Sequence, residues 1–109
     1  MGKGLVKKFH LGIDAFTQKN IDENLIKKVL LDLPKLMEMK TLTKPIVCKG
    51  KTLSGYTGFI IIEESHIAIH HFSSQYRIWI DTLSCKSFDK NSVIDYLKKE
   101  LGIKYARYF

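Results

Sequence analysis

The 109-residue chain contains few cysteines and prolines and no long apolar run. Cys48 and Cys85 are its only cysteines, too few for the disulfide framework of small secreted domains, so we expect free thiols and a cytoplasmic location. No segment approaches the roughly 20 apolar residues that span a bilayer. Residues 1–4 show no secretory leader. These absences predict a soluble protein without a membrane partner.

Acidic residues are also scarce, 11 against 18 lysines and arginines, which gives a net charge of +7. The basic residues are scattered, and pairs such as Lys27-Lys28 and Lys98-Lys99 fall on the polar faces of expected helices. This distribution predicts a solvated surface and no nucleic-acid partner. The length and the 45% hydrophobic content suit one globular domain over residues 1–109.

Two side-chain periods divide the chain into strands and helices. Alternating apolar residues predict strands over residues 5–16, 42–48, 57–62, 66–72, 76–83 and 103–109. Helical spacing predicts one helix that starts at a capping box, Asn20 to Glu23, and is ended or kinked by Pro34. A second helix should start at Ser87 or Asp89 and end at Gly102.

This order of elements predicts an α+β fold, a two-layer sandwich with a mostly antiparallel sheet and helices on one of its faces. Pro45 favours an edge position for the strand over residues 42–48, since proline lacks the amide donor that a central strand needs.

The tripeptide Glu64-Ser65-His66 follows the apolar run over residues 59–62 and carries the most informative chemistry. A tight turn centred on Glu63-Glu64 would pair Thr57 with His70 across a hairpin, with their side chains on one face. Ser65 would lie at the junction, and Cys85 would follow the end of the next strand. We therefore expect a hydroxyl, an imidazole, a strained turn and a thiol to come together.

Such a set of groups can break the bond between Glu64 and Ser65. The Ser65 hydroxyl attacks the preceding carbonyl, a hydroxyl such as that of Thr57 stabilises the oxyanion, and His70 removes the Ser65 α-proton. The products would be chain 1–64 and chain 65–109, the latter starting with a pyruvoyl group. That ketone can form a Schiff base with a substrate amine and act as an electron sink, with Cys85 as the later proton donor.

These residues resemble the small bacterial and archaeal class of S-adenosylmethionine decarboxylase, a family with the pattern S-G-x-x-x-I-x-E-S-H-x-x-I-H-T-W-P-E and then D-x-x-x-C. Residues 57–70 read T-G-F-I-I-I-E-E-S-H-I-A-I-H, and residues 81–85 read D-T-L-S-C. The resemblance implies that Ser65 becomes the pyruvoyl group, that His70 assists processing and that Cys85 donates a proton. It also implies a homodimer of cleaved protomers that supplies the aminopropyl donor for spermidine synthesis.

Two positions depart from the family pattern. Thr57 replaces the processing serine, and residues 71–74 read H-F-S-S in place of T-W-P-E. The resemblance implies that the family glutamate holds the substrate ribose, and Ser74 has no carboxylate that could accept two hydrogen bonds in its place. A smaller amino acid, such as arginine or ornithine, is therefore an alternative substrate. Another alternative is an unprocessed, non-catalytic homologue that acts as a binding or regulatory subunit.

Each candidate residue also has a structural interpretation. Glu64 and His66 flank the serine, so we expect them at the cleavage site or in contact with the substrate, yet they could be ordinary turn residues. A zinc site from His66, His70 and Cys85 is an alternative, but the paired, closely spaced ligands of structural zinc sites are missing from the sequence. We therefore predict no metal. His71 should point to the opposite face from His70 and serve the fold.

Overall fold

The computed structural model describes residues 4–52 and 54–109, so the expectation of a leaderless start at residues 1–3 lies outside the described residues. It contains one six-stranded sheet in the order β2-β3-β4-β5-β1-β6. The elements are β1 (Phe9–Thr17), α1 (Glu23–Leu36), β2 (Ile46–Lys49), β3 (Gly55–Ile62), β4 (Ser65–Phe72), the short 3₁₀ helix η1 (Ser73–Gln75), β5 (Arg77–Ser84), α2 (Lys90–Leu101) and β6 (Ile103–Tyr108).

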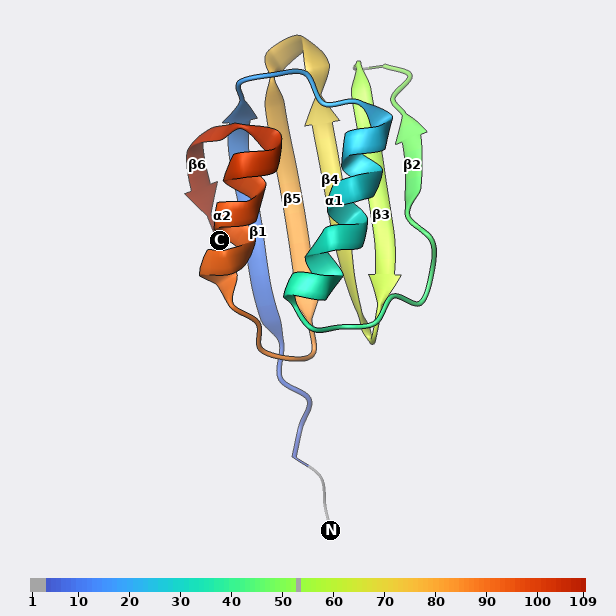
Figure 1. The fold of residues 1–109 in the computed structure, drawn as a ribbon, viewed down its shortest axis with the longest axis vertical. Helices are drawn as coiled ribbons and strands as arrows, with labels where there is room; N and C mark the ends of the chain where they lie inside the picture. The colour runs from blue at the N-terminus through green and yellow to red at the C-terminus, as the bar shows by residue number, and fades with distance from the viewer. Residues whose placement is uncertain (1–3, 53) are drawn as a thin grey trace.

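All neighbouring strands run antiparallel, and both helices cover the same face of the sheet (Figure 1). The predicted α+β sandwich is confirmed. We call the side under α1 and α2 the covered face and the opposite side the open face. The core lies between the helices and the covered face, and its fully buried side chains include Ile26, Leu30, Leu33, Ile60, Ile62, Ile67, Ile69, Ile78, Leu97 and Leu101.

Alternation along β4 shows how one strand serves both faces. Its odd-numbered residues, from Ser65 to His71, are buried under the helices, whereas its even-numbered residues, from His66 to Phe72, are partly exposed on the open face. The expectation that His71 points away from the His70 face is therefore confirmed.

The start of α1 differs from the prediction. Asp22, not Asn20, is the N-cap, and its carboxylate accepts a hydrogen bond from the Leu25 N–H at 2.8 Å. Pro34 does not end the helix at once, since α1 continues to Leu36. The missing proline donor removes only one bond, and that bond belongs to the last turns of the helix, next to its end.

The other boundaries lie close to the prediction except at the starts of two strands, and β2 begins at Ile46 rather than at residue 42. β1 starts at Phe9, later than the predicted residue 5. Asp89 caps α2, and Gly102 ends it in a left-handed conformation with φ of 62°. Pro45 directly precedes the edge strand β2, which confirms the expected edge position. In the described part of the chain, no helix is long and apolar enough to cross a membrane.

Candidate active site

The hairpin of β3 and β4 turns at Glu63-Glu64, as the sequence predicts. Ile62 pairs with Ser65 and Thr57 pairs with His70. Glu64 has a φ of 43°, a left-handed backbone conformation that non-glycine residues seldom adopt. Such a residue stores on the order of 1–3 kcal/mol of strain. The strain therefore lies on the residue whose bond to Ser65 is the candidate for cleavage.

Ser65 and Cys85 lie together at this end of the sheet. The Cys85 backbone N–H donates to the Ser65 Oγ at 2.9 Å, and the Cys85 thiol donates to the Glu63 carbonyl at 3.5 Å. Ser65 is buried and Cys85 is partly buried. β5 supplies this contact because Cys85 directly follows its last residue, Ser84, and β5 pairs with β4. The structure thus brings the predicted nucleophile and the predicted proton donor into contact.

Thr57 and His70 form a second pair of groups on the open face. The Thr57 Oγ1 and the His70 Nδ1 are 3.1 Å apart, within hydrogen-bond distance. The Trp79 ring packs edge-on against the His70 ring, with 6.4 Å between ring centroids. The predicted approach of hydroxyl and imidazole by strand register is confirmed.

The pair formed by Thr57 and His70 does not reach Ser65 within one chain. His70 follows Ser65 by five residues along a strand, which corresponds to roughly 17 Å. Their side chains also lie on opposite faces of the sheet. The expectation that local pairing alone unites the turn with this pair is therefore wrong. Residue parity already contained the signal, because an odd-numbered and an even-numbered residue of one strand face opposite ways.

Sequence reasoning missed a third group of polar side chains. Asp81 accepts hydrogen bonds from His10 and His66, one on each carboxylate oxygen, on the open face. Partial burial works to raise the pKa of Asp81, but the hydrogen bonds from the two imidazoles outweigh it, so this pKa lies below its usual value. Strand register could have revealed the group, since β1 pairs His10 with Leu83 and β4 pairs His66 with the same residue.

His66 therefore lies beside the Asp81 carboxylate, with its ring stacked on Phe59 at 5.5 Å between centroids. The residues of the alternative zinc site do not converge. His66 and His70 face the open side, while Cys85 contacts the turn. In the described residues, no group of three or more histidines, cysteines and acids is arranged to hold a metal ion.

The positions that depart from the family pattern lie at the other end of the hairpin. Ser74 is exposed on η1, which joins β4 to β5. A pocket of about 250 Å³ opens beside Thr57, and the described residues that line it include Lys51 and Phe72 but no acid. His71 is buried against Thr17, 3.3 Å from its Oγ1, and burial lowers its pKa.

Comparison with known proteins finds similarity to one family both in sequence and in fold. The family model described as S-adenosylmethionine decarboxylase matches residues 10–109. An S-adenosylmethionine decarboxylase proenzyme from Clostridium botulinum strain Loch Maree is 33% identical over 102 residues, which cover 90% of this chain and 86% of the relative. The corresponding proenzyme from strain Langeland is 35% identical over 100 residues, which cover 88% and 84%.

A solved structure shares the fold. The crystal structure of the adenosylmethionine decarboxylase from Aquifex aeolicus VF5 superimposes with a TM-score of 0.78, at 19% identity, and the match covers 94% of this chain and 86% of that one. At this identity the likeness concerns the architecture alone. The family model and the two clostridial relatives carry the assignment, and they show that this chain belongs to the S-adenosylmethionine decarboxylase family.

Proposed function

We propose that the chain is a proenzyme that cleaves itself between Glu64 and Ser65 and then decarboxylates S-adenosylmethionine. The product would serve as the aminopropyl donor for spermidine synthesis, in the cytoplasm. The proposal rests on one observation. Ser65 directly follows the strained Glu64, and its Oγ accepts a hydrogen bond from the Cys85 N–H. The names of the clostridial relatives, both decarboxylase proenzymes, support the same activity.

The residues at the turn fit a pyruvoyl group formed from Ser65. This residue is the first of β4, so it would become the first residue of the second fragment while the sheet still holds it. Its surroundings are mostly shielded from water, and the Cys85 thiol lies at the same turn. A pyruvoyl ketone supplies an electron sink for loss of carbon dioxide from a bound amino acid. Cys85 would hold the proton that the substrate carbon then takes up.

The chain's own groups have distinct roles in processing. The strained φ of Glu64 raises the energy of the uncleaved turn, which favours attack by the Ser65 hydroxyl on the Glu64 carbonyl. A hydroxyl donor such as Thr57 would stabilise the oxyanion, and an imidazole such as His70 would remove the Ser65 α-proton. The hydrogen bond between Thr57 and His70 orients both groups.

The separation of this pair from Ser65 supports a homodimer in which a second copy completes the site. The open face carries large apolar side chains that no helix covers, among them Trp79, 46% exposed, and Ile61, 40% exposed. A stable interface typically buries about 800 Å² on each partner. A second copy packed on the open face, with its sheet offset toward the turn, would bury these side chains and bring its own Thr57 and His70 to the end of the sheet beside the Glu64–Ser65 bond.

Co-expression of two inactive variants tests this composite site. A Ser65→Ala chain keeps its His70 but lacks the hydroxyl that attacks the Glu64 carbonyl, and a His70→Ala chain keeps its Ser65. We expect no cleavage of either variant alone and cleavage of the His70→Ala chain when both are present, as measured by mass spectrometry. Failure of the mixture, with dimers present by sedimentation, would mean that each chain uses its own His70.

A smaller amino acid is the second candidate substrate. The exposed Ser74 cannot hold two ribose hydroxyls as a carboxylate does, and the pocket beside Thr57 has no acidic residue in its described lining. Release of carbon dioxide from labelled S-adenosylmethionine, arginine and ornithine distinguishes the substrates. Turnover of arginine or ornithine alone would replace the first assignment.

Mass spectrometry of the purified chain tests the proposed function itself. We expect two fragments, residues 1–64 and 65–109, with the second blocked at its amino end. A chain that stays intact after prolonged incubation would contradict self-processing. It would favour the unprocessed, non-catalytic homologue that acts as a binding or regulatory subunit.

A further inference from the structure

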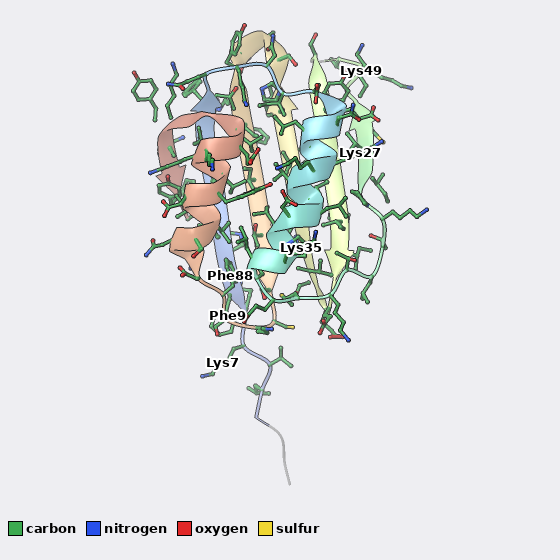
Figure 2. The ribbon with its side chains drawn as sticks, viewed as in Figure 1. Lys7, Phe9, Lys27, Lys35, Lys49 and Phe88 are labelled. Carbon is green, nitrogen blue, oxygen red and sulfur yellow. The ribbon has the colours of Figure 1, made fainter. Side chains whose placement is uncertain are left out.

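The segment before β1, residues 4–8, lies at the same end of the sheet as the turn that carries Ser65. β1 and β5 pair Phe9 with Ser84, so the next positions outward along the two chains are Lys8 and Cys85. Figure 2 shows Lys7 on this segment, below the end of the sheet. A pocket of about 140 Å³ lies here, lined by Val6, Lys7, Lys8, Glu64, Leu83, Ser84 and Cys85.

The charged groups at this pocket are unequally distributed. Lys7 and Lys8 both line it, whereas Glu64 is the single acidic residue in its lining. The neighbouring charged side chains bond to groups outside this pocket. The Glu63 carboxylate accepts a hydrogen bond from the Lys40 backbone N–H at 2.8 Å. The Lys86 ammonium likewise donates to the Glu38 carbonyl, on the loop after α1. The lining of the pocket beside the candidate cleavage bond therefore carries more positive than negative charge.

Processing creates negative charge at this position. Attack of the Ser65 Oγ on the Glu64 carbonyl carbon forms an ester as the peptide C–N bond breaks and frees the Ser65 amine. Loss of the Ser65 α-proton to a base then breaks the Cβ–Oγ bond, and its electron pair leaves with the oxygen as the α-carboxylate of Glu64. Water finally replaces the freed nitrogen, which departs as ammonia and leaves the ketone. The leaving group is thus a carboxylate, at a residue that already has an acidic side chain.

We infer that Lys7 and Lys8 are positioning residues for self-cleavage, which stabilise this departing carboxylate and afterwards hold the new chain end at Glu64. The inference rests on the proposed cleavage of the bond between Glu64 and Ser65. Opposite charges near the protein surface attract through an effective dielectric well below that of water, so they lower the barrier to the step that creates the charge. Since both lysines are exposed, their attraction for the carboxylate is screened by salt.

Cell-free synthesis followed by timed mass spectrometry tests this role. We expect Lys7→Gln/Lys8→Gln to cleave about tenfold more slowly than the unmodified chain, and Lys7→Arg/Lys8→Arg to restore most of the rate because it keeps both charges. The matched control is Lys98→Gln/Lys99→Gln, which removes two exposed charges from α2 and should cleave at the normal rate. Thermal unfolding of the unprocessed Ser65→Ala background, with and without the lysine changes, checks that the fold is unaltered.

Salt dependence gives a readout that a purely structural role would not produce. At about 1 M salt, where the screening length is about 3 Å, cleavage of the unmodified chain should slow toward the rate of the Lys7→Gln/Lys8→Gln chain, which should itself change little. Equal rates for that variant and the control, or failure of the arginine variant to restore cleavage, would overturn the inference while leaving the proposed function intact. An unmodified chain that never cleaves would overturn the proposed function first.

Discussion

The turn at Ser65 and the pair formed by Thr57 and His70 belong to the same hairpin, yet different interactions hold them. The pair depends on the register of two adjacent strands and lies on the open face. The turn depends on a third strand, because Cys85 reaches Ser65 only from the end of β5. Local pairing is therefore sufficient for the first group, whereas the second needs the assembled sheet.

One short segment, β4, therefore contributes side chains to two surfaces. Alternation along β4 directs Ser65 under the helices and His70 to the open face, where a second copy can pack. Substitutions that alter one of the two groups, or one face of the sheet, test this separation.

Removing the nucleophile should have the largest effect. We expect Ser65→Ala to abolish cleavage completely, because the residue after Glu64 then has no hydroxyl to attack the preceding carbonyl. Ser54→Ala, at an exposed loop serine, is the matched control and should cleave normally. Intact mass measured over time decides the outcome, and normal fragments from the Ser65→Ala chain would refute the mechanism.

Changes to the pair formed by Thr57 and His70 should have the second largest effect on cleavage. Thr57→Val keeps the branched shape but loses the hydroxyl, so cleavage should slow by on the order of 10²-fold if this group stabilises the oxyanion. Thr57→Ser keeps the hydroxyl and should cleave at close to the normal rate. Fragment formation measured for both variants separates hydroxyl chemistry from packing. Equal rates would remove Thr57 from processing.

Cys85 should separate processing from turnover. We expect Cys85→Ala to cleave, since its backbone N–H still bonds to Ser65, but to release carbon dioxide about 10²-fold more slowly without the proton donor. Cys48→Ala, at the exposed thiol on β2, is the control and should keep full activity. Full turnover in the Cys85→Ala enzyme would assign the proton to another group.

Packing on the covered face can be tested without touching the site. A Cβ atom at Gly58 would lie 2.5 Å from Ile26 Cγ2 and 3.0 Å from Leu30 Cδ1, both on α1. We expect Gly58→Ala to lower the free energy of unfolding by about 1–3 kcal/mol, since the core there is already filled. Gly4→Ala has nothing within 4 Å and is the control. Denaturant unfolding should give a lower free energy of unfolding for Gly58→Ala than for Gly4→Ala. Equal values would mean that α1 shifts away from β3 at little cost and makes room for the methyl group.

The smallest effect should be a pH dependence that differs between the two faces. On the covered face, burial holds the pKa of His71 below 6.5, so the unfolded chain takes up a proton first and stability is lost as pH falls below about 6.5. On the open face, hydrogen bonds from Arg77 and Arg107 lower the pKa of Asp14 to about 2. Its stabilisation, about 1–2 kcal/mol, is lost as pH falls from about 4 to 2.

The free energy of unfolding, measured against pH for two variants, shows which residue causes each loss of stability. His71→Gln should flatten the stability curve below pH 6.5, and Asp14→Asn should flatten it below pH 4. An unchanged curve in either variant would show that other groups titrate there. Both measurements suit the Ser65→Ala chain, which avoids cleavage during the titration.

The sequence predicted much of this fold because its signals are local. Apolar alternation and the Glu63-Glu64 turn set the pairing of Thr57 with His70. The start of α1 was predicted wrongly, since Asn20 and Asp22 are both good cap residues and the helix begins after Asp22. The group formed by His10, Asp81 and His66 was missed because it joins the neighbouring strands β4 and β5 to β1, which is distant from both in sequence.

The amino-acid order alone was enough to predict the register of β3 with β4, the α+β order and the family pattern around Ser65, because these depend on the period and spacing of neighbouring residues. The folded chain was needed to show that the Cys85 N–H bonds the Ser65 Oγ, that Ser65 and His70 face opposite sides of the sheet, and that residues 4–8 lie against the cleavage end. Contacts of this kind follow from the order in which distant strands pack together, and no local pattern in the chain specifies that order.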